Sequence, residues 1–189
     1  MRLMLAALAM TMLSACGLNS VPRAEEEAKA RWADVENQYQ RRADLIPNLV
    51  AIVKASGKIE KDILVGVTQA RSGALRTTLS AEQLGDPARV AAFERAQGAV
   101  TVSLQRLQEA YPDLQSQRNY VTLMSQIEGA ENRISVARAD YNRAVQAYNT
   151  RIRTFPDSIG ASMIHGAKPL VPFRAVTEGA EVAPKAVFD

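Results

Sequence analysis

Side chains that could do chemistry are few and scattered in this sequence of 189 residues. His165 is the only histidine, so no second one can join it in a common zinc or di-iron site. Neither a Gly-x-Ser-x-Gly motif nor a P-loop is present. Glu128 and Glu131, three apart, suit acid–base work or calcium in principle, but a solvated or ion-paired helix face is commoner. We therefore expect no enzyme, no cofactor and no metal.

Two polar-rich strings carry the most suggestive side chains. The group comprises Glu36, Asn37, Arg41, Arg42, Asp44, Asn48, Glu131, Asn132, Arg133, Arg138 and Asn142. Arg42 takes a slot in a helical repeat where an apolar residue is expected, and periodicity lets it meet Glu131 if the two helices are neighbours. One interpretation is a salt-bridge and amide network that fixes helix register. The other is a recognition surface for another protein or peptide beside Pro47.

The N-terminus has the pattern of a secretory signal. Arg2 precedes an apolar run over residues 3–13, which is shorter than the roughly 20 residues of a membrane span but fits the about 7 to 15 of a signal peptide. Leu13-Ser14-Ala15-Cys16 then resembles the lipobox of bacterial lipoproteins, where the cysteine is lipidated and the chain is cut before it. The sequence predicts a signal peptide over residues 1–15.

Cys16 is the predicted lipid anchor. The alternative is an incidental cysteine after a plain signal peptide, but a lone thiol is a liability in an oxidising compartment. Several acyl chains on one residue make a stable anchor, and residues 16–21 would form a short tether. Gly17, the residue after the cysteine, weakly favours sorting of the lipoprotein to the outer membrane over the inner.

Charge and composition narrow the class of protein further. Lysine and arginine number 23 against 20 aspartates and glutamates, a net charge of +3. So small an excess, without an aromatic-basic motif, argues against nucleic acid as a partner. With a single cysteine no disulfide can form within the chain, so the domain must be stable through packing alone.

Helical spacing runs from Pro22 to Phe155 and predicts an all-α domain. Pro22 is placed at the first position of the first helix. Pro47 predicts a kink or break in that helix, and Ser56-Gly57 is a second candidate turn. The stripe expected to face the core is Ala28, Trp32, Val35, Tyr39, Ile46, Leu49 and Val53.

Three more helical segments follow, the first of them reaching about Leu79. A loop is expected over 84–87, and the next helix over 87–110. The last helix is predicted from Leu114 to Thr154, with Asp113 as its cap. Its heptad-spaced columns predict core rather than a ligand platform. They are Tyr120, Ile127, Ile134, Tyr141, Tyr148 and Phe155, beside Leu123, Ala130, Ala137 and Ala144, with the tyrosine hydroxyls reaching the edge for hydrogen bonds.

Residues 156–189 form a proline- and glycine-containing tail that is expected to be mostly irregular. Its apolar side chains are numerous enough to dock on the helices. They are Ile159, Met163, Ile164, Leu170, Val171, Phe173, Val187 and Phe188.

The strings WADVENQYQRRADLIPNLV (32–50) and ENRISVARADYNRAVQAYNTRIRTFP (131–156) closely resemble the LemA family. The resemblance implies an antiparallel four-helix up-and-down bundle, bromodomain-like, over residues 22–155, tethered to a bacterial membrane with the tail packed on it. It implies no activity. This chain differs from many members in having a lipobox instead of an uncleaved membrane helix.

Three functions are compatible with these features. The first is a membrane-tethered scaffold or adaptor lipoprotein of the bacterial cell envelope, facing the periplasm and binding other envelope proteins. The second is an accessory regulator of a membrane protease or a cell-wall enzyme. The third is a lipid or small-ligand binder, which requires an apolar cavity between the helices.

Overall fold

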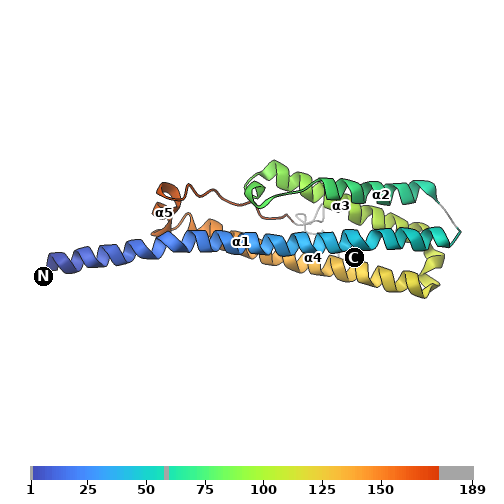
Figure 1. The fold of residues 1–189 in the computed structure, drawn as a ribbon, viewed down its shortest axis with the longest axis horizontal. Helices are drawn as coiled ribbons and strands as arrows, with labels where there is room; N and C mark the ends of the chain where they lie inside the picture. Colours follow the sequence, from blue (N-terminus) through green and yellow to red (C-terminus); the bar gives the residue numbers. More distant parts are fainter. Residues whose placement is uncertain (1, 58–59, 175–189) are drawn as a thin grey trace, which may run out of the picture.

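The computed structural model describes residues 2–57 and 60–174, and this part of the chain is all-helical, as the sequence predicts. Figure 1 shows the long helices α1, α2, α3 and α4 lying lengthwise beside one another, with close backbone contact of α1 with α4 and of α2 with α3. We call α1 to α4 the helical body. The elements are α1 (Arg2–Ala55), α2 (Lys61–Arg76), η1 (Ala81–Gln83), α3 (Pro87–Ala110), η2 (Pro112–Ser116), α4 (Arg118–Arg151) and α5 (Asp157–Met163).

The start of α1 differs from the prediction. Pro22 lies inside the helix rather than at its first position, because residues 2–21 are already helical. Val21 is fully buried, so the packed structure begins within the segment expected to be a tether. Removal of residues 1–15 and lipidation of Cys16 stay predictions.

Of the kink or break expected at Pro47, the break is wrong, since α1 continues to Ala55. Proline has no N–H, so the carbonyl of Ala43 lacks its usual donor within the helix. Arg71 on α2 replaces that donor, with Nε 2.8 Å from the Ala43 oxygen. The chain turns instead at the second candidate, where Gly57 has φ +77°, a conformation that favours glycine.

The last long helix is shorter than predicted. Residues 112–116 form η2, so α4 starts at Arg118 rather than Leu114. Asp113 therefore lies in η2, and the residue before α4 is Gln117, whose extended backbone separates the two elements. The helix ends at Arg151, three residues before the predicted Thr154.

Burial of the apolar stripes confirms most of the predicted core. The seven apolar residues of the α1 stripe are buried, as are Tyr120, Ile127, Ile134, Tyr141 and Tyr148 of α4. Phe155 is 75% exposed, so its inclusion in the heptad column is wrong. In the neighbouring column, Ala144 is half-buried.

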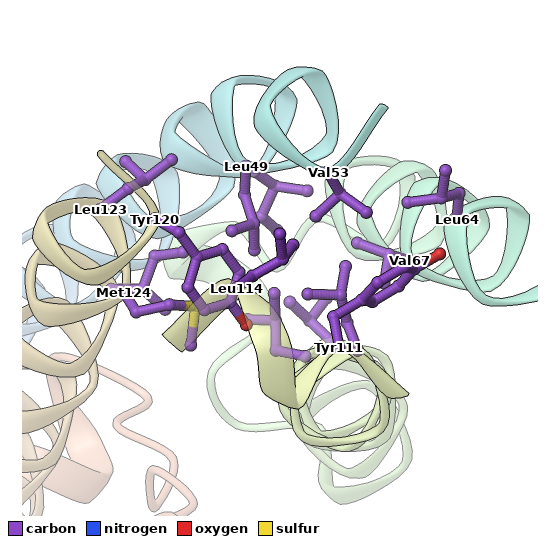
Figure 2. Close-up of a cluster of buried hydrophobic side chains, with 14 of the residues drawn as sticks. Leu49, Val53, Leu64, Val67, Tyr111, Leu114, Tyr120, Leu123 and Met124 are labelled. Atoms are coloured by element: carbon purple, nitrogen blue, oxygen red, sulfur yellow. The ribbon is translucent and has the colours of Figure 1, made fainter. Parts of the chain in front are cut away.

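The core has an apolar cluster at the end where α1 turns into α2 (Figure 2). Leu49 and Val53 of α1 meet Leu64 and Val67 of α2 there, together with side chains from η2 and α4. Tyr111 also has a polar role, since its hydroxyl accepts a 2.8 Å hydrogen bond from the Glu60 N–H at the start of α2.

Towards the other end, an aromatic cluster joins the tail to the helices. Trp32 lies 5.3 Å from Phe93 and 5.7 Å from Phe173, measured between ring centroids. Phe173 is 5% exposed, and Leu170 and Val171 pack beside it, so this part of the predicted tail docking is confirmed.

The rest of the tail departs from the prediction. Within the tail that was expected to be mostly irregular, residues 157–163 form the short helix α5. Ile159, Met163 and Ile164 are exposed instead of docked. Val187 and Phe188 lie outside the described residues.

The contact between Arg71 and Ala43 generates a prediction. Arg71→Met should lower the free energy of unfolding by about 1–3 kcal/mol, because it leaves a half-buried carbonyl without a donor. The same substitution in a Pro47→Ala background should cost much less, since the alanine of that variant supplies its own N–H to the Ala43 carbonyl. Urea denaturation followed by helical circular dichroism measures all four proteins of this cycle. Equal losses in both backgrounds would contradict this account of the intact helix.

Candidate functional site

Arg42 is the most buried charged residue of the predicted polar group, at 1% exposure. Its Nη1 lies 2.6 Å from Glu131 Oε1 and 3.0 Å from Thr101 Oγ1. Its Nη2 donates to Gln97 twice, at 2.8 Å to the side-chain oxygen and 3.1 Å to the backbone oxygen. The guanidinium also lies over the ring of Tyr39, 5.1 Å from its centroid. One side chain of α1 therefore connects α3 to α4. The contact between Arg42 and Glu131, which the helical periodicity allowed, is present.

Two members of this network were missed by sequence reasoning, although one carried a signal. Gln97 occupies a core position in the stripe of α3, between Phe93 and Val100, just as Arg42 does in α1. Polar residues at core positions of two helices identify candidates for a buried pair. Thr101 carried no such signal, because a threonine at the edge of a stripe is ordinary.

A second ion pair joins α3 and α4 at a position farther along the two helices than the Arg42 network. Arg138 Nη2 lies 2.9 Å from Glu94 Oε1 and donates at 2.7 Å to the carbonyl of Arg174. The same guanidinium stacks 4.6 Å from the ring centroid of Phe173. Glu94 also accepts the backbone N–H of Arg174 at 3.0 Å. This pair thus connects the two helices to the tail.

Two asparagines of α4 hold the tail by its backbone. The Asn142 amide donates to the Phe173 carbonyl at 3.0 Å and accepts the Phe173 N–H at 2.8 Å. Asn149 makes the same pair of bonds with Leu170, at 2.8 and 2.9 Å. Each asparagine therefore satisfies both backbone groups of one tail residue. We call residues 168–174 the strap.

The strap and α4 match in spacing. The two asparagines are seven positions apart on the helix, about 10 Å along its axis, and their partners are three positions apart in extended chain, also about 10 Å. Tyr141 and Tyr148, each one residue before an asparagine, donate their hydroxyls at 3.1 Å to the carbonyls of Val171 and Lys168. These two hydroxyls confirm the predicted hydrogen bonding at the edge of the core. Tyr120 does not, since its buried hydroxyl has no partner among the described residues.

A groove of about 1220 Å³ runs between α3 and α4, open to solvent. Arg42 and Tyr39 of α1 line it, with Glu94 on the α3 side and Ser135 on the α4 side. Strap residues 171–174 contribute to the lining. Part of Glu131 is reachable from this groove, because its side chain is 32% exposed.

The remaining predicted residues fall elsewhere. Glu36 and Asn37 border a smaller hollow of about 310 Å³ between α1, α2 and α3, and loss of water raises the pKa of the Glu36 carboxyl above its ordinary value. Arg133 donates to Gln38 at 3.3 Å between α4 and α1. The rest of the group is exposed and was not brought into the network, namely Arg41, Asp44, Asn48 and Asn132.

The described residues contain neither a cluster of metal ligands nor a helix suited to span a membrane. Over residues 2–57 and 60–174, no group of three or more histidine, cysteine, aspartate or glutamate side chains is arranged to hold a metal ion. In the same ranges, no helix has both the length and the hydropathy of a membrane span. His165 is exposed in the tail, and Glu128 is exposed while Glu131 faces Arg42.

A family model, described as the LemA family, matches residues 31–188. This range contains the Arg42 network and the strap. The chain belongs to the LemA family.

Among curated proteins, this LemA-family chain is similar to three magnetosome proteins. It is 29% identical over 157 residues to MamQ 2 and to MamQ 1 of Paramagnetospirillum magneticum, which covers 73% of this chain and 58% of each relative. It is 27% identical over 150 residues to MamQ of Magnetospirillum gryphiswaldense, covering 69% and 55%. The match thus spans little more than half of each relative's length.

The Arg42 network predicts an asymmetry between its two charged partners. Glu131→Gln leaves a buried guanidinium with neutral acceptors, so it should lower the free energy of unfolding by about 3–5 kcal/mol. Arg42→Met leaves a carboxylate that is partly exposed and can regain water, so its cost should be nearer 1–3 kcal/mol. Urea denaturation compares these variants, with Glu128→Gln as the exposed control. If Glu131→Gln is no more harmful than that control, the network does not stabilise the fold.

The strap generates a prediction of its own. Asn149→Ala should speed exchange of the Leu170 amide hydrogen by about tenfold, because a bond worth about 1 kcal/mol or slightly more is lost. Asn142→Ala should do the same for Phe173. Hydrogen exchange resolved by residue measures both, with Asn132→Ala as an exposed control on α4. Unchanged protection of both amides would show that the asparagines do not hold the strap.

Proposed function

We propose that this LemA-family protein is a membrane-tethered helical adaptor of the bacterial cell envelope, without chemistry of its own. In this proposal Cys16 carries the lipid and the domain faces the periplasm, with the outer membrane favoured over the inner. The helical body is an antiparallel four-helix up-and-down bundle of bromodomain-like type. The groove between α3 and α4 receives a segment of a partner protein.

The observation that carries this proposal is an open groove with preorganised polar groups. Arg42 is held by four hydrogen bonds and Arg138 by an ion pair and a carbonyl, so neither guanidinium needs to be ordered when a partner binds. Rigid helices carry the lining side chains, which keeps the entropic cost of binding low. A polar and apolar lining of this kind suits a peptide better than a small apolar ligand.

The strap indicates what form that segment takes. Asn142 and Asn149 already recognise extended backbone without regard to side chains. The groove continues along α4 from the strap, past Arg138 to Glu131. We therefore propose an extended segment whose backbone or polar side chains pair with Glu131, Ser135 and Arg138.

Site-specific photocrosslinking in native membranes tests the groove. A photoreactive residue at Ser135, which lines the groove, should give a discrete product with a partner protein. At Ser125, an exposed serine of the same helix outside the groove, it should not. Ala139→Trp should abolish the product because it fills the groove, whereas Ala147→Trp on the same helix should leave it intact. Identical products from both serines, or a product insensitive to Ala139→Trp, would refute the groove as the binding site.

A further inference from the structure

Large apolar side chains are exposed together where α4 leads into α5. Phe155 is 75% exposed, Ile159 53%, Met163 81% and Ile164 62%. Single exposed apolar residues are ordinary, but four within ten residues at one end of a protein indicate an interaction surface. We call these four residues the α5 patch.

The helix that carries this patch has two distinct faces. Ala161 is 2% exposed and packs against Val21 and Tyr148. Ile159 and Met163 each lie two positions from it, about 200° around a helix, and therefore point the opposite way. The inner face of α5 is thus already used, whereas its outer apolar face has no cover within the described residues.

The position of α5 is fixed relative to the N-terminal part of α1. Arg151 Nη1 donates to the Ser20 carbonyl at 3.2 Å, and its Nε lies 3.6 Å from the Asp157 carboxylate. Figure 1 shows α5 beside the stretch of α1 that leads to the N-terminus. Cys16 and Val21 are five positions apart on the helix, about 8 Å along its axis. The patch therefore lies at the same end of the protein as Cys16, the predicted lipid anchor.

The charges around the patch favour its contact with an anionic surface. Arg153 and Lys168 are exposed and lie close to α5 in the sequence. Arg23 is exposed and follows Val21, which packs against Ala161 of α5. The acidic residues of the adjacent α1 turn are neutralised within the chain, since Glu25 and Glu26 pair with Lys29, and Glu27 pairs with Arg31. Exposed basic side chains beside an apolar face are typical of protein surfaces that enter anionic lipid headgroups.

We infer that the α5 patch is a second membrane contact, which lays this end of the helical body on an anionic phospholipid surface. The apolar side chains enter the boundary between headgroups and acyl chains, and the basic residues meet the phosphates. This inference rests on the proposed membrane tethering, because the tether and the patch are at the same end. It is separate from the groove, which opens between α3 and α4.

Fluorescence of the full chain on vesicles tests the patch. Cys16 is kept, because the proposed lipid occupies its thiol, so Met163→Cys is the thiol labelled with an environment-sensitive dye, and the lipidated protein is reconstituted into vesicles of phosphatidylethanolamine and phosphatidylglycerol. The dye should shift to the blue and be quenched by nitroxide-labelled lipid. A dye at Ser125→Cys, at the opposite end of α4, should do neither. Adding Phe155→Ser and Ile159→Ser should reverse the shift at position 163, and phosphatidylcholine vesicles should weaken it.

Two outcomes would overturn the inference. Equal responses at 163 and 125, including none at either, would show that the patch does not meet lipid. A blue shift that grows with protein concentration before vesicles are added would assign the patch to a second copy of this chain. Phe155→Ser with Ile159→Ser should leave the Ser135 crosslink intact. Failure of the patch is thereby distinguished from failure of the groove.

Discussion

A guanidinium buried among helices constrains the rest of this structure. Arg42 has to find acceptors for its donors inside the protein, because an unpaired buried charge costs several kcal/mol. Glu131 of α4, with Gln97 and Thr101 of α3, supplies them. A planar fork with directional donors accepts few arrangements of those helices, so we expect the network to specify their register. An apolar residue at this position would tolerate sliding of α3 against α4.

The same constraint explains why an open groove persists beside a packed core. Arg42 at one level and Arg138 at the next join α3 to α4 across the groove through polar contacts. The strap then covers one part of the groove, because Asn142 and Asn149 repeat at the spacing that extended chain requires.

Periodicity predicted the helices, the buried stripes and the Arg42–Glu131 contact, because all three follow from the 3.6-residue repeat. It failed where a distant residue changes a local rule. Pro47 predicted a kink or a break, and α1 does not break there; Arg71 of another helix supplies the donor that the Ala43 carbonyl would otherwise lack. The pairing of Asn142 and Asn149 with the backbone of the strap could not be predicted for the same reason. Asparagines on a helix surface carry no sign of partners that lie 21 and 31 residues later.

The tail shows most sharply what an apolar residue in a sequence does and does not indicate. Phe173 and Met163 were both expected to dock, and both are large side chains within the same tail. Phe173 is buried because Asn142 fixes its backbone and Trp32 and Tyr141 offer ring faces at 5.7 and 5.3 Å. Met163 projects from a helix whose opposite face is the one that packs. Hydrophobicity indicates that burial of a side chain is favourable. Whether the side chain is buried against its own chain is decided by the polar contacts that position the backbone of that residue.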